Sequence, residues 1–258
     1  MRNIRTVAAN TFREAVRDRV LYNLVFFALL MMGAAILVGQ ISIGIEQDVI
    51  VSLGLTAISV IGILIAVFLG VALVSKEMDK RTLYALLAKP VKRWEFLLGK
   101  FFGLVMTLTV NTAAMAAGLY LALWTVKHPL LKSDAYILVA VYLILLKLAV
   151  IVALALLFSC FTTPFLAILF SAGIYVAGLF AADLRTVKGV DLDSGSLRLM
   201  RGISYLLPNF QNFNVMGAVV HGRGVPGVFV WQATLYALVY IAIILTGAAV
   251  VFSRRNLK

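Results

Sequence analysis

Charged residues are scarce in this 258-residue chain. Asp, Glu, Lys and Arg together make up 13% of it, about half their share in a typical soluble domain. Hydrophobic residues make up 63%, well above the usual proportion of about one half. We therefore expect an integral membrane protein whose excess apolar surface faces lipid.

The residues that bound metals, disulfides and nucleotides require are also missing. Cys160 is the single cysteine, which excludes an internal disulfide framework. His128 and His221 are far apart and have no cysteine nearby, so we expect no zinc site. The Gly99-Lys100 pair is followed by Phe and has no glycine five residues before it, so it is not a phosphate-binding loop. No nucleophile, base and acid form a recognisable set. We expect this chain to bind no cofactor and not to be an enzyme.

Six apolar runs have at least the length of about 20 residues that crosses a bilayer. We predict that each is a membrane-spanning helix, the first being retained rather than cleaved as a signal peptide. The runs cover residues 20–41, 50–75, 97–125, 135–159, 163–183 and 228–252. No internal repeat or low-complexity linker divides the chain, so we predict a single membrane domain over residues 1–258.

The basic residues predict the orientation of these helices. Residues 2–19, 76–100 and 254–258 carry five, seven and three Lys or Arg, whereas the loops on the other side carry none, two and five. Because cytoplasmic loops are enriched in Lys and Arg, we predict that both termini and residues 76–100 are cytoplasmic. This pattern suits a bacterial inner membrane. It also attributes the net charge of +12 to topology rather than to nucleic-acid binding.

Residues 2–18 have the pattern of an amphipathic helix. Ile4, Ala8, Phe12 and Ala15 fall near one stripe, and the arginines lie largely off it. Such a helix is expected to lie in the headgroup layer, with its basic face toward anionic lipid. The alternative is an ordinary basic flank that only sets topology.

The predicted external segment, residues 184–227, contains a second helical pattern. Its apolar residues recur at helical spacing from Ser196 until Pro208 ends the pattern. They are Leu197, Met200, Ile203, Leu206 and Leu207. We expect a short helix on the outer leaflet or over the external mouth, and packing and gating roles both remain open.

Residues 76–89 predict a short charged helix that projects into the cytoplasm. Glu77 precedes Arg81 by four residues, so the two can pair along one face. Leu83, Leu86 and Leu87 form an apolar stripe, and Pro90 stops the helix. A short leucine stripe needs a surface to cover it. A partner protein and the cytoplasmic ends of the neighbouring spans are both candidates.

This segment resembles the coupling region of ATP-binding-cassette (ABC) transporter permeases of the type-two, exporter-like family. The matching residues are Glu77, Arg81, Thr82, Leu83, Leu86, Leu87, Pro90, Val91, Arg93, Gly99 and Lys100. The amphipathic N-terminal helix, the six spans and the external segment extend the resemblance over nearly the full length. The expected fold is therefore an all-α integral membrane protein with six transmembrane helices. An interfacial helix precedes them, a coupling helix lies between helices 2 and 3, and an external helical segment lies between helices 5 and 6.

The resemblance implies how the protein works. Two permease subunits, identical or different, would form the membrane part of an exporter, and a separate cytoplasmic ABC ATPase subunit would bind ATP and magnesium. Leu83, Leu86 and Leu87 would sit in a groove of that ATPase, while Glu77 and Arg81 hold the coupling helix at its joint with the second span. Thr82, Pro90 and Arg93 complete the implied coupling set.

Two polar residues stand out inside the predicted spans. Lys147 lies near the middle of the fourth span, where a charge costs a few kcal/mol and usually faces a bundle interior or cavity. It predicts either a substrate contact, suited to an anionic group, or a structural contact with backbone carbonyls. Asn111, in the third span, is a candidate for the same pathway or for helix–helix hydrogen bonding.

Small residues form a stripe on the second span. Gly62, Ala66 and Gly70 recur every four residues, a spacing that lets another helix approach closely. The partner helix is either within the subunit or in a second permease.

Two other functional classes are weighed against an ABC permease. One is an ATP-independent channel or carrier, which is disfavoured because the spans carry almost no charge and no inverted repeat is evident. The other is a non-transporting membrane anchor that passes force from an ATPase to an external partner through residues 184–227. Stimulation of ATPase activity by substrate would distinguish a transporter from such an anchor.

Overall fold

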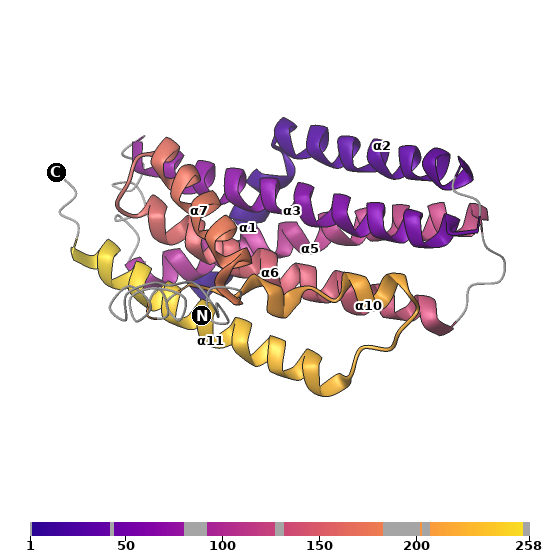
Figure 1. The fold of residues 1–258 in the computed structure, drawn as a ribbon. Helices are drawn as coiled ribbons and strands as arrows, with labels where there is room; N and C mark the ends of the chain where they lie inside the picture. The colour runs from indigo at the N-terminus through magenta and orange to yellow at the C-terminus, as the bar shows by residue number, and fades with distance from the viewer. Residues whose placement is uncertain are drawn as a thin grey trace.

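A computed structural model describes residues 2–41, 44–79, 92–126, 132–182, 202 and 207–254. All regular structure in these residues is helical (Figure 1). Residues 80–89 of the predicted coupling helix and half of the predicted external segment, residues 184–201 and 203–206, lie outside the described residues.

Apolar helices occur at all six predicted positions. They are α2 (Arg19–Ile41), α3 (Glu46–Asp79), α5 (Arg93–Val126), α6 (Tyr136–Ser159), α7 (Pro164–Leu179) and α11 (Gly227–Arg254). A short 3₁₀ helix, η1 (Lys132–Ala135), precedes α6. The predicted and observed ends of these helices therefore differ by only a few residues.

Four of these helices, α3, α5, α6 and α11, are long and apolar enough to cross a membrane. The apolar part of α2, Leu24–Gly39, and helix α7 are shorter. At about 1.5 Å per residue, the 16 residues of α7 extend about 24 Å, less than the roughly 30 Å of a hydrocarbon core. The chain is a multi-pass helical membrane protein, and its division into six complete spans stays a prediction.

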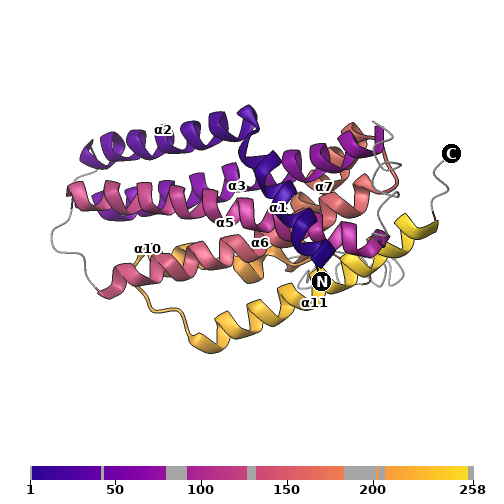
Figure 2. The same ribbon diagram turned by 180° about the vertical axis from the view of Figure 1, so that it is seen from behind.

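Helices α3, α5 and α6 pack against one another at the centre of the bundle. Helix α2 contacts α3 and α5 along one edge, and α11 contacts α6 and α5 along the opposite edge (Figures 1 and 2). The outward faces of α2 and α11 expose large apolar side chains such as Phe26, Leu37, Trp231 and Ile243. An apolar surface of this extent is expected where lipid or another membrane subunit covers the protein.

Helix α1 (Arg2–Val16) crosses α5 at a steep angle near one end of the bundle (Figure 2). Thr11 and Ala15 are buried, whereas Arg5, Arg13 and Arg17 are exposed. The helix predicted for residues 2–18 is thus present and amphipathic. Its inner face packs on α5, however, so lipid is not the only surface that covers the apolar stripe.

The described part of the external segment enters the bundle. We call residues 207–220 the inserted segment; they include the 3₁₀ helix η2 (Phe210–Phe213) and helix α10 (Met216–Val220). These elements pack against α3, α6 and α7, and Figure 1 shows α10 beside α6. The sequence predicted a helix only as far as Leu207, and the packing of residues 207–220 against α3, α6 and α7 was not predicted. The helix predicted from Ser196 to Leu207 falls almost entirely outside the described residues.

Candidate functional site

Lys147 lies at mid-length of α6, eleven residues after Tyr136 and twelve before Ser159. Its ammonium group donates a hydrogen bond of 2.6 Å to the Ser59 hydroxyl on α3. It also lies 6.0 Å from the centroid of the Tyr175 ring on α7, a distance at which the face of the ring attracts a cation. Three helices that are distant in the sequence therefore converge on one lysine.

Lys147 and Ser59 line a cavity of about 160 Å³, which we call the mid-bundle cavity. Leu55 and Ile144 add apolar wall from α3 and α6, and Tyr175 closes the side toward α7. Residues 210, 211 and 213–216 of the inserted segment also line it, together with Ala140 of α6 and Leu179 of α7. The cavity is thus built from four parts of the chain, and Lys147 supplies its charge.

The inserted segment is held over this cavity by hydrogen bonds. The Asn209 N–H donates to the Tyr236 hydroxyl on α11 at 2.8 Å, and the Gln211 amide donates to the Leu179 carbonyl on α7 at 2.8 Å. The Asn209 side chain accepts from the backbone N–H of Gln211 and so caps η2. These bonds provide hydrogen-bond partners for backbone groups. A non-helical segment at membrane depth needs such partners because the hydrocarbon core offers none.

Close contact between α7 and the inserted segment depends on Gly178. A Cβ atom at Gly178 would lie 2.6 Å from the Phe210 ring, closer than side-chain atoms pack. Phe210 is fully buried, and its ring centroid is 5.2 Å from that of Tyr175. The same ring that faces Lys147 is therefore positioned by Phe210.

Asn111 lies apart from the mid-bundle cavity. It is buried on α5, and its side-chain nitrogen has no hydrogen-bond partner among the described residues. Asn111 is not among the residues that line the mid-bundle cavity with Lys147. A substrate pathway that includes both residues therefore stays a prediction.

The small-residue stripe on α3 lies against α6 of the same chain. A Cβ atom at Gly62 would be 2.6 Å from a Leu148 methyl group, and one at Gly70 would be 2.9 Å from the Ala155 Cβ. Ala66 between them is buried. The stripe therefore has a helix of the same subunit against it, and a contact with a second permease stays a prediction.

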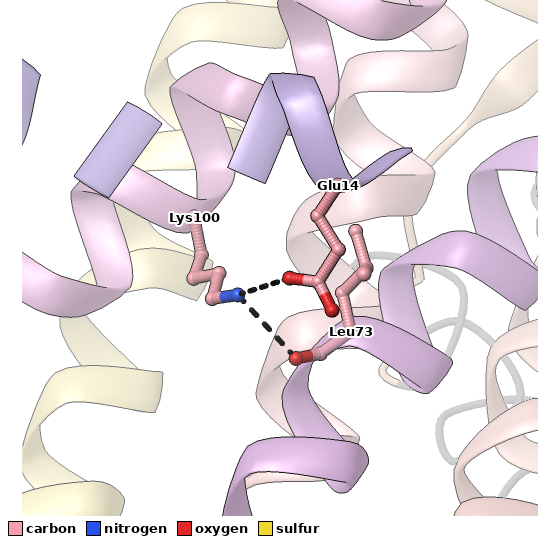
Figure 3. A network of polar contacts seen from close by, with 3 residues as sticks. All are labelled: Glu14, Leu73 and Lys100. Carbon is pink, nitrogen blue, oxygen red and sulfur yellow. Dashed lines mark hydrogen bonds and ion pairs between the residues drawn. The ribbon is translucent and has the colours of Figure 1, made fainter. Parts of the chain in front are cut away.

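A second polar cluster joins the helices at the end of the bundle where α3 ends and α5 begins; we call this the basic end. Lys100, on α5, is only 2% exposed, and its ammonium group lies 3.9 Å from a Glu14 carboxylate oxygen on α1. It also donates to the Leu73 carbonyl on α3 at 3.5 Å (Figure 3). Counting Lys100 among the basic loop residues was wrong, because it is buried where three helices meet.

Two glycines of α5 allow α1 to approach this closely. A Cβ atom at Gly99 would lie 2.6 Å from the Val7 Cβ, and one at Gly103 would lie 2.6 Å from the Thr11 Cβ. A further link is the Asn3 side chain, which donates to the Glu95 carboxylate at 3.2 Å. Glycines four residues apart thus form a packing surface for α1, as in other close helix pairs in membranes.

Arg93 connects the start of α5 to the end of α11. Its guanidinium donates to the carbonyls of Phe252 at 2.8 Å and Ser253 at 3.0 Å, and it lies 5.8 Å from the centroid of the Phe252 ring. A cation at the C-terminus of a helix stabilises the terminal carbonyls and the helix dipole. Arg93, predicted as a coupling residue, therefore has a structural contact in the described part of the chain.

A family model described as ABC-2 family transporter protein matches residues 5–257. The chain belongs to the ABC-2 transporter family. A comparison with curated proteins found no match. The family assignment confirms the resemblance drawn from residues 76–100 and makes this chain a membrane permease of an ABC transporter, a transport component rather than a catalytic one.

In this ABC-2 permease, the predicted coupling residues divide into three groups. Glu77 belongs to α3, which continues to Asp79, so the first residues of the expected coupling helix extend the spanning helix. Arg93 lies at the start of α5. The rest of the set lies outside the described residues: Arg81, Thr82, Leu83, Leu86, Leu87 and Pro90.

Sequence reasoning missed several residues around Lys147 in this permease. Ser59 and Tyr175 are polar groups within separate apolar helices, and a polar group in an apolar run was the available signal. The amide residues after Pro208 were a further signal, because four of them fall within six positions just before the last helix. They are Asn209, Gln211, Asn212 and Asn214.

Proposed function

We propose that this permease is the membrane subunit of an ABC exporter and that a separate cytoplasmic ATPase docks on residues 76–89. The observation that carries the proposal is the geometry at the basic end. Helices α3 and α5 each have 34 residues, or about 51 Å at about 1.5 Å per residue. Each is therefore about 20 Å longer than a hydrocarbon core. The C-terminal end of α3 and the N-terminal end of α5 both lie at the basic end.

The connection between these two helices is short and both of its ends are anchored. Only residues 80–92 separate α3 from α5. Lys100 links α5 to the Leu73 carbonyl of α3 and to Glu14 of α1. A force applied to this connection would therefore act on α1, α3 and α5 together, which is what a coupling element has to do.

The proposal assigns ATP and magnesium to the partner subunit, because this sequence has no phosphate-binding loop of its own. It also includes a second permease subunit, with the exposed apolar edges of α2 and α11 available to lipid and to that subunit. Both termini and residues 76–100 face the cytoplasm of a bacterial cell in this scheme, following the distribution of Lys and Arg.

The docking proposal is tested by placing a charge in the leucine stripe. Tagged permease is purified from its native host in mild detergent, and co-purifying proteins are identified by mass spectrometry. The native chain is expected to carry an ABC ATPase in a stoichiometric amount. Leu86→Asp and Leu87→Asp are expected to lose it, because a carboxylate buried in an apolar groove costs several kcal/mol.

Leu257→Asp is the matched control, since it makes the same change on the same predicted side of the membrane. It should retain the ATPase, and all three variants should insert in the membrane normally. Retention of the ATPase by both Leu86→Asp and Leu87→Asp would show that the docking assignment is wrong. Stimulation of the bound ATPase by a transported compound would then distinguish an exporter from a force-transmitting anchor.

A further inference from the structure

The mid-bundle cavity holds a cation without a carboxylate to neutralise it. None of the described residues that line it is Asp or Glu. Lys147 is half-buried near mid-length of α6, about 17 Å from either helix end at about 1.5 Å per residue. A lysine at this depth normally pairs with an opposite charge or faces a polar cavity. The missing countercharge points to a ligand.

We propose that the mid-bundle cavity is a binding site for a small oxyanion, such as a phosphate, a sulfate or a short carboxylate. This inference names a ligand class for the permease and rests on the proposed function only for the step from binding to transport. Lys147 supplies the charge, and Ser59 supplies a hydroxyl beside it.

The donor arrangement suits oxygen acceptors. An ammonium group has three N–H donors, and one of them is directed to the Ser59 oxygen at 2.6 Å. The other two have no hydrogen-bond partner among the described residues. Because the Ser59 oxygen accepts from Lys147, its own O–H is directed elsewhere and can donate to an anion. Charge-assisted hydrogen bonds of this kind are roughly twice as strong as neutral ones.

The size of the cavity limits the ligand. A volume of about 160 Å³ is roughly five times the 30 Å³ that one water molecule occupies in the liquid. This admits a tetrahedral oxyanion or a short carboxylate with one or two waters. Phe210, Phe213 and Val215 provide apolar wall, which lowers the local dielectric and strengthens the attraction between the ligand and Lys147.

The cavity is connected mechanically to the basic end. Ser59 lies on α3, whose C-terminal part carries the Leu73 carbonyl that Lys100 contacts. Lys147 lies on α6, so a displacement of α3 along α6 changes the distance between the ammonium and the hydroxyl. Oxyanion binding would therefore respond to movement of the predicted coupling segment.

Binding is tested on the purified full-length permease in an uncharged, phosphate-free maltoside detergent, without any ATPase. Sulfate, phosphate and acetate are titrated at constant ionic strength, balanced with chloride, and the midpoint of thermal unfolding is followed. A ligand that binds only the folded state stabilises it in a saturable way. A parallel titration uses short-chain phosphatidylglycerol in place of the free anions.

Three variants make the test specific, since sulfate and phosphate also stabilise proteins without binding. Lys147→Met is expected to lose the saturable part of the response. Ser59→Ala is expected to raise the Kd about ten- to a hundredfold, as for loss of one hydrogen bond to a charged group. Lys92→Met, a change of the same kind at an exposed position of the basic end, is expected to bind as the native chain does.

A native chain that shows no saturable response to any free oxyanion or to the lipid overturns the proposal. An equal saturable response in Lys147→Met also overturns it. A Lys147-dependent response to phosphatidylglycerol alone supports the site and assigns the oxyanion to a lipid headgroup. Because this test uses no ATPase, a failure to bind oxyanions does not count against the docking proposal. The docking test measures only ATPase co-purification, so its result does not bear on the oxyanion site.

Discussion

The Lys100 ammonium lies 3.9 Å from the Glu14 carboxylate and thereby joins α5 to the N-terminal helix. The two side chains differ in environment, since Lys100 is 2% exposed and Glu14 is 36% exposed. The lysine also contacts the Leu73 carbonyl and lies 5.8 Å from the Phe96 ring centroid. Helix α1 is therefore held to the bundle by a buried charge as well as by apolar packing.

This asymmetry predicts that Glu14→Ala destabilises the permease more than Lys100→Met does. Removing Glu14 leaves a buried ammonium with less compensation, at a cost of about 1–3 kcal/mol. Methionine removes the charge and fills similar space, so Lys100→Met is expected to cost less. Thermal unfolding in detergent measures both. The double variant should be more stable than Glu14→Ala alone, and an equal or lower stability would contradict this account of Lys100.

The close crossing of α1 and α5 predicts that Gly103→Ala loosens α1. The new methyl group would lie 2.6 Å from the Thr11 Cβ and 2.7 Å from the Ala8 carbonyl oxygen. Overpacking of this kind costs about 1–3 kcal/mol. The measurement is thermal unfolding together with the rate at which protease cleaves within residues 2–16.

Gly247→Ala is the matched control for that substitution. Gly247 lies on α11, and a Cβ atom there would meet nothing within 4 Å. The change should be neutral or stabilise by about 0.5–1 kcal/mol, because alanine favours a helix over glycine. Equal stability of the Gly103 and Gly247 variants would indicate that α1 does not depend on this contact.

The capping contact of Arg93 predicts that Arg93→Met frays the last turn of α11. Loss of donors to the Phe252 and Ser253 carbonyls is expected to cost about 1–2 kcal/mol, or roughly a five- to thirtyfold rise in local opening. Hydrogen exchange of residues 250–254, read by mass spectrometry, measures this. Lys92→Met is the neighbouring control and should leave the exchange unchanged. Loss of ATPase binding without increased exchange would instead favour a direct coupling role.

The anchor of the inserted segment predicts that Tyr236→Phe loosens residues 207–213. The change removes the acceptor for the Asn209 N–H, and an unsatisfied buried N–H costs about 1–3 kcal/mol. Exchange at residue 209 should therefore rise by at least fivefold. Tyr22→Phe makes the same change at an exposed residue of α2 and should have no such effect. Unchanged protection at residue 209 in Tyr236→Phe would show that the segment is held by its other contacts.

The inserted segment shows why the sequence predicted some features and not others. The distribution of Lys and Arg predicted an external location for residues 184–227, because it assigns both termini and residues 76–100 to the cytoplasm. Burial of Asn209 and Phe213 depends on partners such as Tyr236, which is 27 residues away along the chain from Asn209. No local pattern encodes such a pairing. The amide-rich stretch after Pro208 indicated only that something unusual lies before α11.

Lys147 illustrates the same division. Its isolation within an apolar run was enough to single it out and to suggest a cavity, since a charge at that depth needs a polar environment. The hydroxyl of Ser59 and the ring of Tyr175 were not predicted, because both belong to other helices. Packing also decided that Gly62 and Gly70 meet α6 of the same chain.

The sequence by itself determined the helical class, the position of each apolar helix, the family and the excess of basic residues at one end. These follow from local hydropathy, charge and short motifs, which are properties of contiguous residues. Only the tertiary structure decided that α1 lies across α5, that Lys100 is buried, that residues 207–220 enter the bundle and that Lys147 meets Ser59. In a bundle whose helices are apolar on every side, hydrophobicity does not distinguish a lipid-facing surface from a packed one. Close approach and polar pairing between distant helices make that distinction.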